Sequence, residues 1–364
     1  MNRNEIIEKL ELNSSPIATV NWLRNVYFSE IMDRFNLPDS RKRFALYQGE
    51  QIPVNERNLT DVRTRMGVLI EFELARLSND LLRENNINGI FWSYVVANRF
   101  PDLEIRRSDG NRLLRLEIKC LQCIAEEKSA NFDTLRKDID PSADYVIVGL
   151  WDWEKNTADE FSWDSTPMLK KIYVFNAYSL ALLRDTYWLN RPPTDLGSGY
   201  QGFDIRYAVT CTDGVFSKEQ GNYGKLTRIW KQDFAYPPPE SEITQDTITE
   251  YLKFQREIIW AGFEILAKNH LIEFVPDNSD LNAVYDNERN IVGYQKGDLL
   301  YLLTSSLSRT QCFNIANRND ATCLVTMTEK YRCSVFQKSR DSWNAVSQNQ
   351  KPKNVNLFIH RSES

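Results

Sequence analysis

The chain of 364 residues is 42% hydrophobic and carries a formal net charge of −5, which predicts a sizeable core in one elaborated domain or two. Six cysteines are too few for a disulfide scaffold at this length, and His270 and His360 are the only histidines, which argues against histidine-based catalysis. No apolar run approaches about 18 residues and no signal-peptide pattern opens the chain. We therefore expect a cytoplasmic protein without membrane contact.

Residues 1–60 are predicted to form an N-terminal helical extension. The run Asn13-Ser14-Ser15-Pro16 is typical of a helix N-cap followed by proline in the first turn. It predicts a helix that continues to about Phe35. Residues 36–60 are polar and rich in turn-forming residues.

A long and strongly apolar helix is predicted over residues 64–85. Its main apolar stripe, with three residues that widen it, consists of Met66, Ile70, Leu74, Leu77 and Leu81, with Val68, Leu69 and Phe72. A helix this apolar is expected to be largely buried, yet Glu71 and Glu73 interrupt it. A buried carboxylate needs a partner, so these two residues are candidates for a functional or structural role.

Residues 99–119 are predicted to form a β-hairpin that brings two carboxylates together. Its centre contains Asp109-Gly110, which favours a two-residue type I′ turn. With these two residues as the loop, Asp102 falls directly opposite Glu117. Directly opposed residues have Cβ atoms about 4.5–5.5 Å apart, so the two carboxylates can share a divalent cation.

The alternation of a strand also places Lys119 on the face of Glu117, at the end of the hairpin away from the turn. These charges can alternatively be ordinary surface residues of a solvated hairpin. Like charges directly opposed destabilise a strand pair, whereas a metal ion removes the repulsion. We therefore favour a metal site of the kind that hydrolyses phosphodiesters.

Residues 61–236 are predicted to form the core of the protein, with insertions. After the hairpin we expect a helical crossover at about 129–138 and a strand at 146–150 that is covered on both faces. A further strand is predicted at 172–175, followed by a helix at 177–185. Residues 190–236 are irregular, and no internal repeat is visible in the chain.

Residues 237–364 are predicted to form a C-terminal helix and an α+β region that serves in DNA recognition or dimerisation. The proline-rich run at 236–241 is a stiff linker, and an amphipathic helix is expected over 244–269. Its expected inner face consists of Tyr251, Leu252, Ile258, Ile259, Ile265 and Leu266. Residues 301–364 hold nine Lys and Arg against four Asp and Glu, a net charge of +5, so the other 300 residues carry −10. A local phosphate contact or a solvated tail explains this basic segment equally well.

Pro101-Asp102, separated by fourteen residues from Glu117-Ile118-Lys119, resembles the motif of the PD-(D/E)xK nuclease superfamily. The order of helix, hairpin, crossover helix and buried strand is also similar, over about residues 64–180. Length and embellishment resemble a type II restriction endonuclease. The resemblance implies an α/β fold: a restriction-endonuclease-like core with a central mixed β-sheet flanked by helices, plus N-terminal helical and C-terminal α+β additions.

The resemblance also implies a set of site residues. One or two Mg²⁺ ions per active site are expected to contact Asp102, Glu117, Ile118 and Glu71. Lys119 is expected to orient the attacking water or to stabilise negative charge. The helix carboxylate of the site is Glu71 or its rival Glu73, and either can instead form a salt bridge with Arg76.

Contacts to DNA are weaker predictions. Gln122 follows the catalytic strand, Asn131 lies where the crossover helix begins, and Lys225 and Arg228 lie in a loop with glycines and aromatics. At the end of a strand Gln122 is more often simply solvated, and Asn131 can belong to polar residues that serve the helix dipole. A structural loop is at least as good an interpretation of Lys225 and Arg228. The expected function is sequence-specific, Mg²⁺-dependent cleavage of double-stranded DNA by a prokaryotic restriction enzyme, acting as a homodimer on a palindromic site.

Two alternatives remain open from the sequence. The first is another nuclease of the same superfamily, acting in repair nicking, junction resolution or transposon-end cleavage. The second is a catalytically inactive DNA-binding module, against which the presence of Asp102, Glu117 and Lys119 argues.

Overall fold

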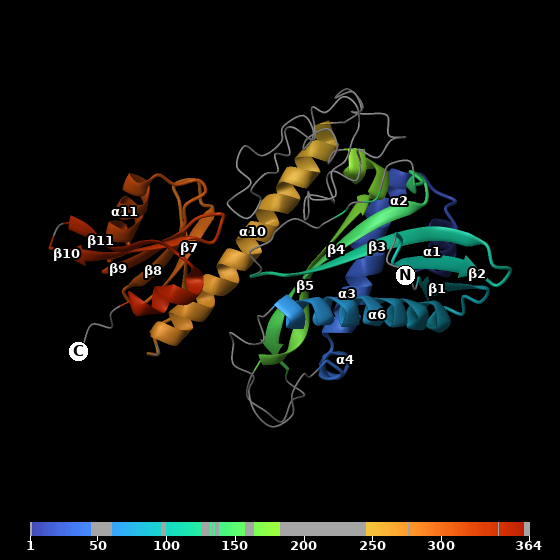
Figure 1. The fold of residues 1–364 in the computed structure, drawn as a ribbon, viewed down its shortest axis with the longest axis horizontal. Coiled ribbons are helices and arrows are strands. Elements are labelled where there is room, and N and C mark those ends of the chain that lie inside the picture. The colour runs from blue at the N-terminus through green and yellow to red at the C-terminus, as the bar shows by residue number, and fades with distance from the viewer. Residues whose placement is uncertain are drawn as a thin grey trace, which may run out of the picture. The chain divides into compact units, whose positions relative to one another are not determined.

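The computed structural model describes the following residues of the chain: 2–44, 60–95, 100–124, 132, 134, 138–156, 164–182, 245–275, 277–340 and 342–359. The chain divides into two compact units, Met1–Gln122 with Ser129–Phe254, and Cys123–Lys128 with Gln255–Ser364 (Figure 1). Each unit has one mixed β-sheet with helices, so the α/β class is confirmed. Of the helices in these described ranges, none combines the length and apolarity needed to cross a membrane.

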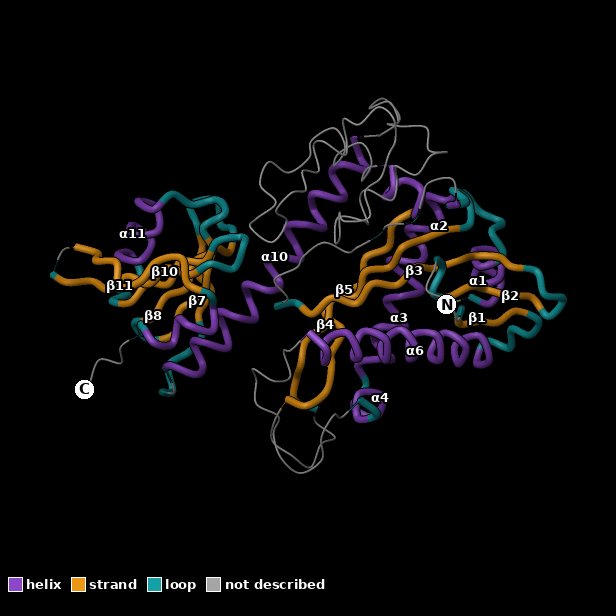
Figure 2. Tube along the Cα trace, in the orientation of Figure 1, coloured by secondary structure: helices purple, strands orange, loops and turns teal. Residues whose placement is uncertain are grey.

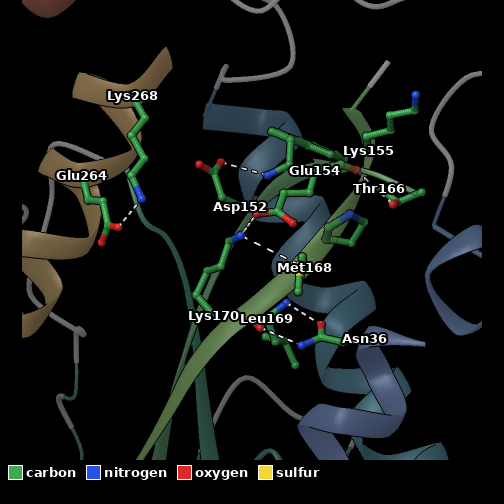
Figure 3. A network of polar contacts seen from close by, with 12 residues as sticks. Asn36, Asp152, Glu154, Lys155, Thr166, Met168, Leu169, Lys170, Glu264 and Lys268 are labelled. Carbon is green, nitrogen blue, oxygen red and sulfur yellow. Dashed lines mark hydrogen bonds and ion pairs between the residues drawn. The ribbon is translucent and has the colours of Figure 1, made fainter. Parts of the chain in front are cut away.

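The N-terminal helices belong to the first unit rather than forming a separate one. They are α1 (Arg3–Leu10), α2 (Pro16–Trp22), a π-helical turn (Leu23–Tyr27), α3 (Phe28–Asn36) and α4 (Pro38–Lys42). Ser15 caps α2 by accepting a hydrogen bond from the Ala18 amide, as the sequence predicts. The Asn36 side chain at the end of α3 bonds both the amide (2.9 Å) and the carbonyl (2.8 Å) of Leu169, as Figure 3 shows. These bonds fasten α3 to the sheet.

The long apolar helix is α6 (Thr60–Glu84). All five residues of its predicted main stripe are buried in the core of the first unit. The three residues predicted to widen the stripe, Val68, Leu69 and Phe72, are 41%, 43% and 50% exposed, so that prediction is wrong. The apolar stripe is therefore narrower than predicted, and of the two carboxylates that interrupt it Glu73 is buried and Glu71 is half-buried.

The first sheet, sheet A, has the strand order β1-β2-β3-β4-β5. Its strands are β1 (Ile90–Tyr94), β2 (Leu103–Arg107), β3 (Arg112–Gln122), β4 (Asp144–Lys155) and β5 (Asp164–Asn176). Only β3 and β4 pair in parallel, and the other neighbours are antiparallel. Residues 144–153 of β4 are buried without a break, which confirms the predicted strand covered on both faces. Residues 177–182 are helical, as expected.

The hairpin of β2 and β3 keeps the predicted register near the site, although its turn differs from the prediction. Leu103 pairs with Leu116 as expected, but a register shift intervenes before the turn. The Gly110 amide donates to Arg107 O and the Arg107 amide to Asn111 O, each at 2.9 Å, and only Gly110 of the loop has a positive φ, of 88°. A type I′ turn needs positive φ at both central residues, so the loop is instead a three-residue turn with Gly110 at the left-handed position.

The second unit contains sheet B, with the strand order β11-β10-β9-β8-β7-β6. Its elements are the part of α10 (Gln245–Phe274) from Gln255 onward, β6 (Asn282–Tyr285), β7 (Ile291–Lys296), β8 (Leu299–Leu303), α11 (Arg309–Arg318), β9 (Cys323–Met327), β10 (Cys333–Ser339), β11 (Ser342–Gln350) and a 3-10 helix (Pro352–Leu357). Figure 2 shows its strands together with α10 and α11. The predicted linker at 236–241 lies outside the described residues.

Sheet B is covered on both faces. Along β8, Tyr301 packs in a cluster with Phe263 and Ala267 of α10, whereas Leu300 and Leu302 pack in another cluster with α11. The inner face of α10 in this unit is thus Phe263, Ala267 and Leu271, and of the predicted inner face only Ile258 is fully buried. The side chains of Tyr251 and Leu252 lie outside the described residues. Burial on both faces explains why β8 is apolar at every position.

Candidate active site

Four predicted site residues come together beside the middle of strand β3 of sheet A. Glu71 comes from α6, Asp102 from the segment just before β2, and Glu117 and Lys119 from β3. Asp102, Glu117 and Lys119 all act on the pKa of Glu71, and the three carboxylates all act on the pKa of Lys119. The hairpin and the helix thus bring three carboxylates and one lysine close enough for their charges to interact.

Asp102 lies one residue before β2, beside the middle of β3. Its amide donates to Leu116 O at 2.9 Å, and its carboxylate Oδ2 accepts the Ile118 amide at 2.7 Å. Asp102 is therefore bonded to the two residues of β3 that flank Glu117, and so lies beside Glu117. Because the Ile118 side chain is 1% exposed and belongs to the core, only its main chain could contact a metal.

Glu117 and Lys119 point to the same face of β3, as the alternation predicts. Lys119 Nζ lies 2.6 Å from Glu117 Oε1, and both side chains are largely shielded from solvent. Burial lowers the pKa of Lys119, but Glu117, Asp102 and Glu71 together outweigh it, so this pKa lies above its ordinary value. The lysine is therefore a fixed cation among carboxylates rather than a base ready to accept a proton.

Of the two helix carboxylates, Glu71 faces the site and Glu73 does not. Glu73 is buried in salt bridges with Arg76 at 2.6 Å and Arg43 at 3.7 Å. A Cβ on Gly67 would meet the Cβ of Cys120 at 3.6 Å, so α6 runs close to β3 one turn before Glu71. This close approach brings the Glu71 side chain beside the strand that carries Lys119.

Burial and like charges raise the pKa of Glu71 to about 7, from an ordinary 4.5. Burial is the largest cause, followed by the charge of Asp102, while Lys119 opposes both and Glu117 adds to them. Tyr94 Oη lies 3.5 Å from Glu71 Oε2. In the absence of metal, Glu71 therefore gains or loses its proton near neutral pH, whereas an ordinary glutamate is ionised there.

The raised pKa of Glu71 predicts how stability depends on pH in the absence of metal. Between pH 4.5 and about 7 the folded protein holds a proton that the unfolded chain releases, so stability falls as pH rises through this window. Glu71→Gln mimics the protonated form. In EDTA the variant should match wild type near pH 5 and melt higher at pH 8, by about 2–4 °C per kcal/mol of relieved repulsion.

Thermal melts of both proteins in EDTA across this pH window test the prediction. Glu84→Gln is the control, because its exposed carboxylate, in a salt bridge with Arg34 at the far end of α6, lies outside the site. A Glu71→Gln variant less stable than wild type at pH 8 would contradict the assigned environment of Glu71.

The donors of the site suit a hard cation, although they face protein groups in this structure. Within the described ranges, no group of three or more histidine, cysteine, aspartate and glutamate side chains is arranged so that it could hold a metal ion. Asp102 accepts the Ile118 amide and Glu117 accepts Lys119. Magnesium is commonly held by one or two carboxylates, with water and substrate phosphate completing its shell, so Asp102 and Glu117 fit this mode of binding.

The predicted DNA contacts have different outcomes. The Gln122 side chain is buried, and its amide donates to Asp152 Oδ1 at 2.9 Å, which gives it a structural partner within the sheet. Figure 3 shows the side chain of Asp152 on β4. Asn131, Lys225 and Arg228 lie outside the described residues.

Two residues near the candidate site, Tyr94 and Arg115, were not among the predicted site residues. Tyr94 stacks on Phe72 with ring centroids 4.2 Å apart and approaches Glu71, but the sequence carries no signal for this contact. Arg115 precedes Glu117 on the same face of β3 and binds both oxygens of Asp144 at 2.5 Å. Its place on the face of Glu117 follows from the alternation, whereas its partner on β4 follows only from the parallel register.

Comparison of the chain with models of protein families, with curated proteins and with solved structures found no match. The assignment of this site therefore depends on its residues and their geometry.

Proposed function

We propose that the protein is a Mg²⁺-dependent endonuclease that hydrolyses phosphodiester bonds of double-stranded DNA at specific sequences, as type II restriction endonucleases of the PD-(D/E)xK superfamily do. In this proposal sheet A with α6 is the restriction-endonuclease-like core. The observation that carries it is the convergence of Asp102, Glu117 and Lys119 on adjoining segments of one hairpin, with Glu71 added from α6. A hairpin without a ligand has little reason to set two carboxylates beside one lysine, with a third carboxylate added from α6.

Each residue has a role that follows from its environment. Asp102 and Glu117 would hold the metal, with Glu71 and the main chain of Ile118 beside them. A bound Mg²⁺ lowers the pKa of a coordinated water and polarises a phosphoryl oxygen. Lys119 keeps its proton because carboxylates surround it, so it orients the attacking water and stabilises the charge that develops on the phosphate. Glu71 adds a third negative charge once its proton is lost.

Digestion of phage DNA tests the proposal. The protein is incubated with the DNA in Mg²⁺ or in EDTA, and the ends of the products are mapped. Discrete fragments that appear only with Mg²⁺ support a restriction activity. For a palindromic target, two copies of the chain would cut the two strands, so we expect a homodimer on the cleaved site.

The other outcomes distinguish the alternatives. Single-strand nicks, or cuts that require branched DNA, would replace restriction by repair or junction cleavage. Tight binding of DNA without any cutting in Mg²⁺ or Mn²⁺ would indicate a binding module and overturn the proposed catalysis.

A further inference from the structure

Sheet B repeats the connectivity of sheet A. In each, a long helix (α6 or α10) precedes three antiparallel strands, and the third strand pairs in parallel with the next strand of the chain. That strand then pairs antiparallel with its successor (β5 or β10), and sheet B adds β11 at its edge. The strand of sheet B that corresponds to β3 is therefore β8.

The acid-bearing positions of β3 have no polar counterpart on β8. This strand reads Leu-Leu-Tyr-Leu-Leu over Leu299–Leu303 and is buried at every residue. Where Glu117 and Lys119 face the site, Leu300 and Leu302 face α11. The second unit thus has the connectivity of the first without the acid and lysine set of β3 on the corresponding strand β8.

The distinctive surface of the second unit is the antiparallel ribbon of β10 and β11. Six cations stand at its two ends. Lys338 and Arg340 lie at the turn, while Lys330 and Arg332 precede β10 and Lys351 and Lys353 follow β11. The pairing of Cys333 with Gln350 places the last four at one end, and that of Ser339 with Ser342 places the turn at the other.

These six cations differ in their ion pairing from the cations near the candidate site in the first unit. Four of the six are exposed and two are half-buried, and none forms an ion pair with another residue of the described ranges. In the first unit, by contrast, Arg106, Arg115 and Lys119 are bound by carboxylates. Glu329 and Asp341 adjoin Lys330 and Arg340 in the sequence, so the six cations exceed the acids beside them by four. Cations that are not held in ion pairs are available to contact a polyanion.

The strand between the two groups of cations is uncharged. β11 has nine residues, Ser342–Gln350, none of them acidic or basic, and Asn344, Gln348 and Asn349 are exposed. At about 3.3 Å per residue, the two ends of β11 lie about 27 Å apart. The long side chains of the flanking lysines and arginine extend the spacing between the two groups of cations toward the helical repeat of duplex DNA, about 34 Å. β11 is the edge strand of sheet B, because β10 pairs with β9 on its other side.

The ribbon is anchored to the rest of its unit. Trp343 stacks on Phe313 of α11 with ring centroids 5.8 Å apart, and its Nε1 donates to Asn317 at 3.1 Å. Arg309 lies over the rings of both Phe313 and Phe336. These contacts hold β10 and β11 against α11, so the two groups of cations keep their spacing without a bound partner.

We infer that the β10–β11 ribbon binds the phosphate backbone of duplex DNA, with Lys338 and Arg340 on one side and Lys351 and Lys353 on the other. The inference deepens the proposed function, because it names the surface that holds the same substrate. The second unit thereby supplies affinity, while sheet A supplies the chemistry.

Binding of a duplex of about 30 base pairs, close to three helical turns, to the full-length protein in EDTA tests the inference. The double variants Lys338→Ala/Arg340→Ala and Lys351→Ala/Lys353→Ala should each bind about 10-fold more weakly, on any sequence. Each should also reduce the slope of log K against log salt by about 2, the loss of two phosphate contacts. The control Arg256→Ala/Lys268→Ala removes two cations from α10 of the same unit and should leave this slope unchanged.

Several results would overturn the inference. They are an unchanged affinity and slope in both ribbon variants, no binding of duplex by wild type, or equally tight and ribbon-dependent binding of single-stranded DNA. The outcome is separable from that of the proposed function. If the protein cuts no DNA but its binding depends on the ribbon, the inferred binding surface stands and the proposed nuclease activity is refuted. If the ribbon variants bind and cleave DNA like wild type, the nuclease activity stands and the inferred binding surface is refuted.

Discussion

Lys119→Ala should cleave DNA about 10²–10³-fold more slowly than wild type, the cost of removing one group that stabilises transition-state charge. Its affinity for duplex DNA should stay within about threefold, because Lys119 is shielded beside Glu117 and the binding surface we propose lies in the other unit. Single-turnover cleavage and equilibrium binding of one duplex measure the two quantities separately.

Two controls separate this loss of chemistry from a loss of folding. Lys170→Ala removes a lysine of β5 that forms an ion pair with Glu154 in the same unit (Figure 3), and it should cleave like wild type. Lys119→Arg keeps the charge and should retain more activity than the alanine variant. The alanine variant also leaves Glu117 without its cation, so its melting temperature should fall. A Lys119→Ala protein that cleaves within tenfold of wild type would refute the assigned role.

The register of the hairpin could be predicted from the sequence although its turn could not. Asp-Gly marked the place of the turn, and the apolar alternation of β3 fixed which residues face the core. A slip by one residue would turn Glu117 and Lys119 into the apolar core in place of Leu116 and Ile118. The three-residue loop displaces the pair Arg106–Arg112 beside the turn, and the register shift between Glu104 and Arg106 restores the predicted pairing at Glu104 and Leu103. The burial of apolar side chains thus set the register of the hairpin at the candidate site, whereas the preferences of the turn residues set only the conformation of the loop.

Apolar residues on the helices were harder to orient. Val68, Leu69 and Phe72 look like core residues in the sequence but are exposed, because α6 contacts the sheet along a single stripe. On α10, apolar residues occur around most of the circumference, and the packing of sheet B selects Phe263, Ala267 and Leu271. A helix that is apolar nearly all round does not encode which side meets a partner.

The choice between Glu71 and Glu73 also depended on tertiary structure. Both carboxylates interrupt the same apolar helix, and the sequence offers Arg76 to either. The structure pairs Arg76 with Glu73, and the close packing at Gly67 turns Glu71 toward Lys119. Likewise, the shared connectivity of the two sheets leaves no sequence repeat, because strand order depends on pairing and handedness rather than on particular side chains.

Glu117→Gln should abolish Mg²⁺-dependent cleavage, with a loss of at least about 10³-fold, since a direct metal ligand is worth several kcal/mol of transition-state stabilisation. The change keeps the size of the side chain and removes one charge, so the fold and the affinity for duplex in EDTA should persist. Removing this charge also takes one repulsive carboxylate from Glu71, which lowers the pKa of Glu71 toward its ordinary value.

Titration of Mg²⁺ at constant ionic strength gives a readout that a purely structural role would not change. Wild type should show saturable protection against thermal unfolding by Mg²⁺, and Glu117→Gln should show weaker protection at each concentration. The matched control is Glu73→Gln, which removes a buried carboxylate held by Arg76 on α6. That variant should lose stability but keep its Mg²⁺ response and most of its cleavage. If Glu117→Gln instead behaves like Glu73→Gln, the two acids of the hairpin hold the fold together and no metal.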